Sequence, residues 1–149
     1  MSIVFRTNCK TLWYLNLHRL LAYERLSEDV IIELILDEKI DDVLSNLNDG
    51  DKKTYIESII RMLNHYIKVK SQEVYEIFSR ERELFFENPK AFVEKHKNRD
   101  VFPILMKVVR NGYDETAVVE NIKEMIKKRT SKLTTAKAFL SAVAESLTL

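Results

Sequence analysis

The chain has 149 residues, which is enough for one domain with its own hydrophobic core. Apolar residues make up 46% of the sequence, whereas Gly and Pro occur only twice each, so the chain lacks the turn residues of a hairpin-rich β fold. The net charge is +1, although the charged residues are distributed unevenly. The composition therefore predicts an all-α fold.

Several classes of protein do not fit this sequence. The longest apolar runs, such as Val101–Met106, are far too short to cross a bilayer, so we expect no membrane partner. The N-terminal residues lack the clean apolar stretch of a signal peptide. Cys9 is the only cysteine, which excludes an internal disulfide. These features predict an intracellular protein of the cytoplasm or nucleus.

The first predicted helix covers Lys10–Arg25. Ser27 is a suitable N-cap for a second helix, which runs from Glu28 to about Leu47 with a break near Asp37. The residues 48–51, with the sequence Asn-Asp-Gly-Asp, are typical of a turn. A long helix is expected to follow this turn.

The segment Asp51–Glu87 contains neither Gly nor Pro, and it predicts one uninterrupted helix. At 1.5 Å per residue, that helix would be roughly 55 Å long. An apolar seam with steps of four and three runs along it, interrupted by Lys70 and Glu81. The seam consists of Ile56, Ile60, Leu63, Ile67, Lys70, Val74, Ile77, Glu81 and Leu84. The interruptions argue against a self-sufficient coiled coil, so we expect shorter helices to cover the seam.

Four shorter helices are predicted after the long one. Asn88 and Pro89 suit the start of the first of these, around Ala91–Val93. Asp100 is the predicted cap of the next helix, which ends at Asn111-Gly112. Asp114 caps a third, and Thr134 or Thr135 opens the last. Their apolar positions are Ile104, Leu105, Val108, Val109, Val118, Val119, Ile122, Met125, Ile126, Phe139, Leu140, Val143 and Leu147.

These elements together predict a helical bundle of about six to eight helices built on one central helix at about 51–87. We expect residues 1–149 to form a single all-helical domain. The best candidate for an internal boundary is the stretch 88–99, which would separate residues 1–88 from residues 99–149.

Charges of opposite sign gather in two parts of the chain. Residues 27–51 carry nine acidic side chains and one Lys, whereas residues 89–137 carry twelve basic and six acidic side chains. One interpretation is two solvated faces that pair with each other or with water. The alternative is an acidic docking strip at Asp37, Glu38, Asp41 and Asp42, with a basic segment for an acidic protein or nucleic acid. The candidate nucleic-acid contacts are Lys123, Lys127, Lys128, Arg129 and Lys132.

No motif in the sequence indicates a reaction. His18, His65 and His96 lie far apart, and no zinc-type spacing of His or Cys exists. Glycines occur only at positions 50 and 112, which excludes the glycine-rich phosphate-binding loops. Cys9 has no sequence partner that would mark it as an activated nucleophile. We therefore predict no catalytic residues, no metal site and no cofactor, and a protein that is not an enzyme.

Part of the long helix resembles a known family. Ile56-Glu57, Ile59, Leu63, Tyr66-Ile67-Lys68, Lys70, Val74 and Phe78 resemble the central helix of GINS subunits. The segment Leu17–Ser27 also looks like the leading helix of archaeal members, and the resemblance covers residues 12–85. In two respects the chain departs from the family pattern. Lys68 and Lys70 stand where the family favours Arg, and residues 113–149 predict helices where a small β-rich domain is expected.

GINS is an accessory complex of the archaeal and eukaryotic replicative DNA helicase. The resemblance implies a non-enzymatic scaffold subunit that packs against related subunits in a tetramer. That tetramer would bridge the minichromosome-maintenance helicase ring and a RecJ-like partner. The residues expected to supply core and subunit packing are Ile56, Ile60, Leu63, Ile67, Val74 and Ile77. A homo- or hetero-oligomer with protein partners is therefore expected.

A third interpretation concerns the second predicted helix. Ile32, Leu36, Asp41 and Val43 follow the spacing of a BH3-type helix, and the chain has the size of a Bcl-2-like bundle. Lys39 stands where that motif has an apolar residue, and the Asn-Trp-Gly-Arg signature of the Bcl-2 family is absent from the sequence. The alternatives to an assembly subunit are thus a nucleic-acid-binding protein and a Bcl-2-like helical bundle that engages BH3-type helices.

Overall fold

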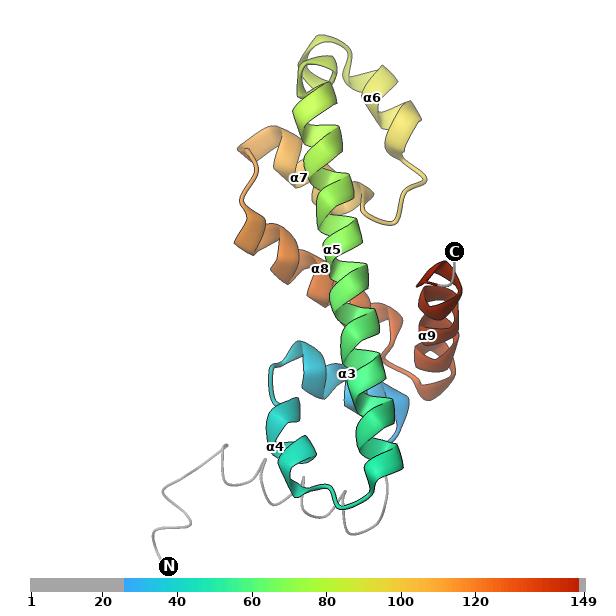
Figure 1. Cartoon of the computed structure of the whole chain (residues 1–149). Helices are drawn as coiled ribbons and strands as arrows, with labels where there is room; N and C mark the ends of the chain where they lie inside the picture. Colours follow the sequence, from blue (N-terminus) through green and yellow to red (C-terminus); the bar gives the residue numbers. More distant parts are fainter. Residues whose placement is uncertain (1–25, 148–149) are drawn as a thin grey trace, which may run out of the picture.

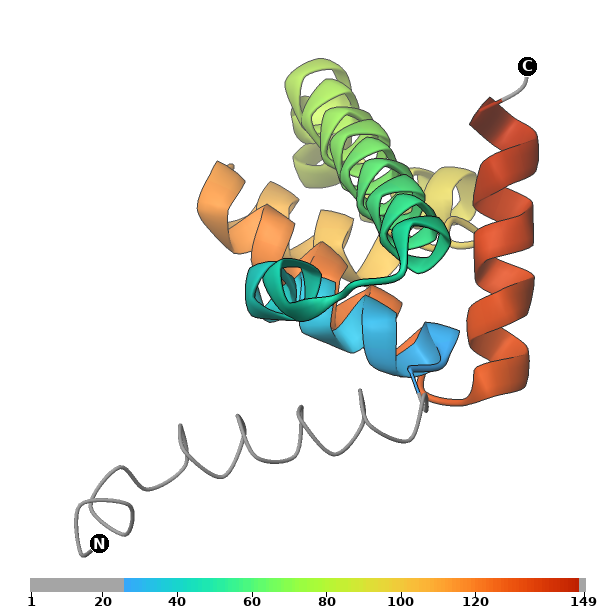
Figure 2. The same ribbon diagram turned by 60° about the horizontal axis from the view of Figure 1, so that its bottom comes forward.

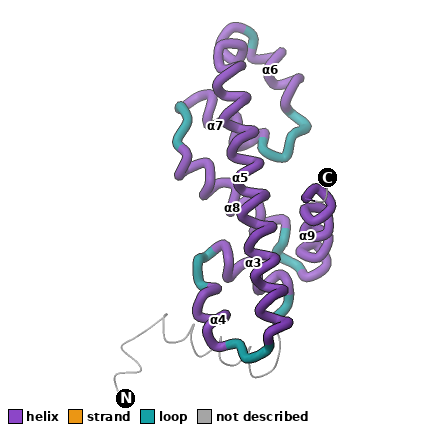
Figure 3. Tube along the Cα trace, in the orientation of Figure 1, coloured by secondary structure: helices purple, strands orange, loops and turns teal. Residues whose placement is uncertain are grey.

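The structure is a computed structural model that describes residues 26–147. The predicted helix at Lys10–Arg25 lies outside the described residues. Within them the chain is all-α, as predicted, and contains no strand (Figure 3). The helices are α3 (Glu28–Leu36), α4 (Ile40–Asn46), α5 (Gly50–Glu87), α6 (Pro89–His96), α7 (Phe102–Asn111), α8 (Glu115–Arg129) and α9 (Leu133–Leu147).

The long helix α5 has 38 residues and forms the axis of the bundle (Figure 1). It contacts α3, α6, α7, α8 and α9, so helices from both sides of the 88–99 stretch pack on it. In the turned view, the shorter helices lie below and beside α5, and its opposite long side carries no other described helix (Figure 2). The prediction of one central helix covered by shorter ones is confirmed.

Several helix starts follow the predicted capping chemistry. The carboxylate of Asp49 accepts hydrogen bonds from the backbone N–H groups of Asp51 and Lys52 at 3.0 and 3.3 Å. Asn88 accepts from Ala91 N–H at 3.2 Å, and Asp114 accepts from Thr116 N–H at 3.2 Å. Each of these side chains satisfies an N–H group that the first turn of a helix leaves without a backbone partner.

Two predicted helix starts are wrong. The N-cap position of α7 is occupied by Val101 rather than Asp100. The carboxylate of Asp100 instead accepts hydrogen bonds from Tyr66 and Lys70 of α5. Helix α9 begins at Leu133, before the two threonines, and Thr135 Oγ1 donates to the carbonyl of Lys132 at 3.0 Å.

The predicted break near Asp37 separates α3 from α4. Asp37 is the C-cap of α3, and Glu38 adopts a positive φ of 59°, which a helix cannot continue. At the other predicted stop, Gly112 has φ 98° and ends α7. Only glycine adopts this backbone conformation readily, which explains its position there.

The hydrophobic core runs along one face of α5 and continues into all the shorter helices. In the seam, Ile56, Leu63, Val74 and Ile77 are buried within this chain, whereas Ile60 and Ile67 are partly buried. Ile59 and Ser71 are also buried, although neither belongs to the predicted seam. Because the shorter helices cover these side chains, the four buried residues contribute to the core of this chain and are not accessible to a second one.

Candidate functional site

The two interruptions of the apolar seam belong to one network of charged side chains. Lys70 and Glu81 point toward α6 and the segment that joins α6 to α7, and the charged groups there satisfy them. The network links α5 to that part of the chain over four turns of helix. Its members are Tyr66, Lys70, Glu73 and Glu81 of α5 with Lys95, His96, Arg99 and Asp100.

His96 lies at the centre of this network and is only 1% exposed. Its Nε2 lies 3.1 Å from a carboxylate oxygen of Glu81, and its Nδ1 accepts a hydrogen bond from Nε of Arg99 at 3.0 Å. This geometry fits a neutral ring that donates through Nε2. Burial lowers the pKa of His96, and the charges of Arg99 and Lys95 add to this effect, so that the opposing charge and hydrogen bond of Glu81 do not restore it. The arrangement is that of a satisfied structural histidine.

Asp100 holds the other end of the network. It accepts from the Tyr66 hydroxyl at 3.0 Å and from Lys70 Nζ at 3.0 Å. Burial opposes ionisation of Asp100, but the hydrogen bond and charge of Lys70 outweigh it, and the pKa is lowered. The pKa of the Tyr66 hydroxyl is raised by burial and by Asp100, so this group remains a neutral donor.

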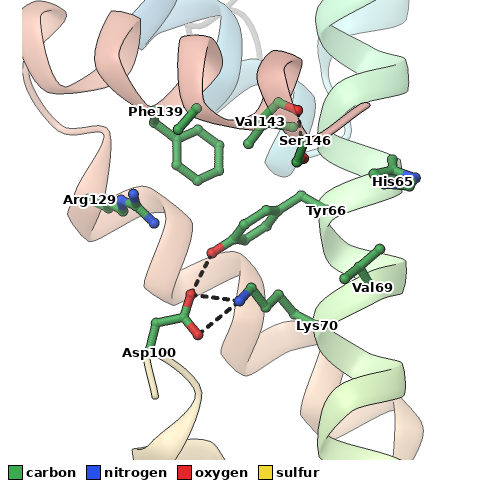
Figure 4. Close-up of a pocket in the computed structure, with 10 residues that line it drawn as sticks. His65, Tyr66, Val69, Lys70, Asp100, Arg129, Phe139, Val143 and Ser146 are labelled. Atoms are coloured by element: carbon green, nitrogen blue, oxygen red, sulfur yellow. Dashed lines mark hydrogen bonds and ion pairs between the residues drawn. The ribbon is translucent and has the colours of Figure 1, made fainter. Parts of the chain in front are cut away.

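Beside Asp100, side chains of α5, α8 and α9 enclose a pocket of about 280 Å³, which we call the α5–α8–α9 pocket (Figure 4). Most of its lining is apolar and comes from Val69, Phe139, Ala142 and Val143. The rings of Tyr66 and Phe139 meet edge to face, with their centroids 4.9 Å apart.

The charged groups of this pocket lie near the Tyr66 hydroxyl, whereas the polar side chains of His65 and Ser146 line it elsewhere. In Figure 4 the Tyr66 hydroxyl and the Lys70 ammonium group both point to Asp100, and Arg129 lies beside the same hydroxyl. The guanidinium carbon of Arg129 lies 5.0 Å from the centre of the Phe139 ring. Among the ion pairs of the described residues, Lys70 has carboxylate partners, whereas Arg129 appears in none.

The acidic and basic strips predicted from sequence meet in the fold. Nζ of Lys127 on α8 lies 2.5 Å from Asp37 at the end of α3, and Nζ of Lys123 lies 3.7 Å from Glu38. The hydrogen bond to Asp37 raises the pKa of Lys127. Half of the predicted acidic docking strip thus pairs with two of the predicted nucleic-acid contacts inside the same chain. These contacts agree with the interpretation of two charged faces that pair with each other.

The remaining members of the two strips lie apart. Asp41 and Asp42 are exposed on α4, and Lys132 is exposed between α8 and α9. Lys128 lines a shallow pocket between α7 and α8, away from Arg129. The five predicted basic residues therefore face at least three different surroundings, and nucleic-acid binding by this segment stays a prediction.

The residues of the BH3-type pattern are divided between two helices. Ile32 and Leu36 belong to α3, while Asp41 and Val43 belong to α4. Ile32, Leu36 and Val43 are all buried in the core. Because a BH3-type helix presents its apolar pair and its Asp from one helix, this segment does not present that surface in the structure.

A group of aromatic side chains lies toward the C-terminal end of α5, with Tyr75 and Phe86 exposed and Phe78 and Tyr113 partly buried against the core. We call it the aromatic surface, and it consists of Tyr75, Phe78, Arg82 and Phe86 of α5 with Tyr113 of the α7–α8 connection. Tyr75 and Phe86 are 52% and 60% exposed. The rings of Tyr75 and Tyr113 meet edge to face at 5.0 Å, and the Arg82 guanidinium carbon lies 5.2 Å from the Phe78 ring and 5.7 Å from the Phe86 ring.

Sequence reasoning missed both the pocket and the aromatic surface. The pocket depends on Asp100 and Phe139, which are far from Tyr66 in sequence, so only the packing of α9 and the α6–α7 segment on α5 creates it. The aromatic surface had a sequence signal, because Tyr75, Phe78, Arg82 and Phe86 recur at intervals of three and four residues. These four positions lie outside the apolar seam, and they indicate a second face of α5 that is not covered by other helices.

No family model, curated protein or solved structure matches this chain significantly. Among residues 26–147 no group of three or more His, Cys, Asp or Glu side chains is placed to hold a metal ion. No helix in the same range has the length and apolar character needed to cross a membrane. The geometry of the surfaces described above therefore provides the basis for a functional proposal.

Proposed function

We propose that this protein is a non-enzymatic subunit of a protein assembly and that it docks a partner through the aromatic surface. The observation that carries the proposal is the exposure of Tyr75 and Phe86 beside Arg82 on the uncovered part of the longest helix. Large aromatic side chains and Arg are the residues that most often dominate the binding energy of protein interfaces. A partner that covers these rings would remove apolar area from water.

The charges of this surface indicate the chemistry of the partner. Arg82 lies against two rings, and no ion pair among the described residues includes it. Its N–H groups are therefore available for a carboxylate, which a planar guanidinium binds in two-pronged geometry. We infer a helical partner that presents a Glu or Asp side chain next to aliphatic side chains. The carboxylate would sit on Arg82, and the aliphatic groups would cover Phe86 and Tyr75.

The most specific form of the proposal is a GINS-like accessory factor of the replicative DNA helicase, working in the cytoplasm or nucleus. Its support is the resemblance within 12–85, together with a central helix that is about 57 Å long at 1.5 Å per residue. Two residues of that resemblance, Tyr66 and Lys70, hold Asp100 in place. The partner would then be a related helical subunit, and the helicase components would join through the assembled complex.

Affinity purification of the native protein, followed by mass spectrometry, tests this function. We expect related helical subunits and helicase components to copurify with the wild-type chain and to be lost from the F86A and R82E variants. The matched control is Y55A, which removes an exposed aromatic ring from the opposite end of α5. Recovery of helical partners unrelated to replication would contradict the GINS-like form alone. Equal recovery with F86A, R82E and Y55A would contradict the aromatic surface as the docking site.

A further inference from the structure

We propose that the α5–α8–α9 pocket binds a small monocarboxylate whose other end is apolar, such as an arylalkyl acid. The proposal is independent of the assembly function, because the pocket and the aromatic surface share no residue. It rests on the volume of the pocket, on its apolar walls, and on the charge of Arg129.

The apolar part of the pocket determines the size and the apolar character of the ligand that it can accept. Its volume of about 280 Å³ is close to the lower limit of small-molecule sites, roughly 300 Å³. Phe139 and Val143 are almost fully buried, which indicates walls fixed by the core rather than by mobile side chains. The edge-to-face pair of Phe139 and Tyr66 offers an aromatic wall, which an aryl ring contacts favourably.

The polar end of the pocket sets the charge of the ligand. Asp100 is bound by Lys70 and by the Tyr66 hydroxyl, so the negative charge of this corner is already compensated. Arg129 adds a positive charge that no carboxylate among residues 26–147 balances through an ion pair. A carboxylate at this position would bind the guanidinium group through charge-assisted hydrogen bonds. A cationic ligand or a dianion would fit less well than a monocarboxylate. The reason is that the lining holds only one positive charge that no carboxylate balances.

The geometry also orients the ligand. Arg129 lies over the Phe139 ring, so a carboxylate that meets the guanidinium group brings its first methylene groups against Phe139 and Val143. The apolar end then extends toward Ala142 and Val69, which line the more open part of the pocket. Arg129 is exposed to water, which weakens its attraction for an anion, so we expect binding of modest affinity.

The test uses the full chain and titrates it with 3-phenylpropionate and with its neutral amide, 3-phenylpropanamide. Binding is followed by calorimetry and by NMR shifts of the methyl groups of Val69, Ala142 and Val143. We expect the carboxylate to bind. The affinity of the amide should be lower by about tenfold or more, which is the loss expected for one charge-assisted contact. The R129Q variant should lose about the same factor for the carboxylate and little for the amide.

Two further variants keep the result interpretable. R110Q removes an exposed Arg at the end of α7, outside the pocket, and should bind the carboxylate like the wild type. A142F places a large side chain in the pocket from an exposed position of α9 and should abolish binding while unfolding with an unchanged urea midpoint. Equal affinity for acid and amide, unchanged binding by R129Q, or no binding of the acid at all would each overturn the proposal.

Discussion

At the scale of single residues, Lys70 and Glu81 show how polar side chains can occupy an apolar seam. The sequence identified both as interruptions, and the spacing of the remaining positions correctly placed Ile56, Leu63, Val74 and Ile77 in the core. It could not show which groups would satisfy the interruptions, because Asp100 and His96 approach α5 only after the chain has turned twice. Which group pairs with a charged residue depends on the tertiary structure. Whether an apolar residue of a helix is buried depends largely on the local spacing of apolar residues.

His96 should contribute to stability through its polar partners and its packing on Phe92. H96A removes the ring and leaves Glu81 and Arg99 without one partner each, so we expect a loss of about 2–3 kcal/mol in the free energy of unfolding. Urea denaturation monitored by circular dichroism measures this loss. H65A, at an exposed position of α5, is the control and should change stability by about 0.5 kcal/mol at most.

The same residue predicts a pH dependence. An unfolded His titrates near pH 6.5, whereas the pKa of His96 is lowered in the fold, so the unfolded chain binds this proton more readily. The stability contributed by neutral His96 is therefore complete above about pH 6.5 and is lost as the pH falls below that value. The pKa values of Glu81 and Asp100 are lowered from their ordinary values of 4.5 and 3.8, so these two groups affect stability in a separate, more acidic range.

The H96Q variant separates this effect from other titrations, because Gln can accept and donate but does not ionise. Urea midpoints are measured at about pH 7.5 and pH 5.5, on either side of the pKa of an unfolded His. From the higher to the lower pH, the midpoint should fall in the wild type and change less in H96Q. If H96Q loses as much stability as the wild type over this range, other groups account for the dependence.

At the scale of helices, the sequence predicted the described elements well because their ends carry local signals. Asp49, Asn88, Gly112 and Asp114 act at the positions that their chemistry favours. The predicted start of α7 was wrong because Asp100 binds Tyr66 and Lys70 of α5, and Val101 takes the N-cap position. The apolar seam indicated the covered face of α5, but which helix covers each part of it depends on packing between distant segments and was not available from the sequence.

Gly112 provides a test of one helix end. Its φ of 98° is strained for any residue with a Cβ, although an added Cβ would meet nothing within 4 Å. We expect G112A to lower the free energy of unfolding by about 1–3 kcal/mol through backbone strain alone. Gly50 also has open space around it but no positive φ, so G50A should be neutral or stabilising. Equal effects of the two substitutions in urea denaturation would argue against strain at Gly112.

The pair of Lys70 and Asp100 tests how firmly α5 holds the α6–α7 segment. A double-mutant cycle with K70A and D100A should give a coupling energy of roughly 0.2–1 kcal/mol, because the two side chains are 20% and 36% exposed and water screens their charges. Both single variants and the double variant are measured by urea denaturation. A coupling energy of zero would show that Asp100 is positioned by Tyr66 and its backbone alone.

At the scale of the whole molecule, shorter helices cover the long helix α5 along one side, and no other described helix lies on its opposite side (Figures 1 and 2). Tyr75 and Phe86 of this helix are exposed. In the same fold Asp37 and Glu38 pair with Lys127 and Lys123 across α3 and α8, whereas Asp41, Asp42 and Lys132 stay exposed. The sequence predicted the fold class and the central helix, and the pairing of two charged faces was one of its two interpretations. It could not show which members of the strips would pair, because that depends on how α3 and α8 pack.

Sedimentation velocity at micromolar concentration tests the central claim, that the protein is an assembly subunit acting through the aromatic surface. The experiment compares the wild-type chain, alone and with its copurified partner, with the Y75A/F86A variant and with the Y55A control. We predict an assembled species for the wild type and for Y55A, and a folded monomer for Y75A/F86A. A wild-type chain that stays monomeric with every copurified protein, or a Y75A/F86A variant that assembles like the wild type, would contradict the account.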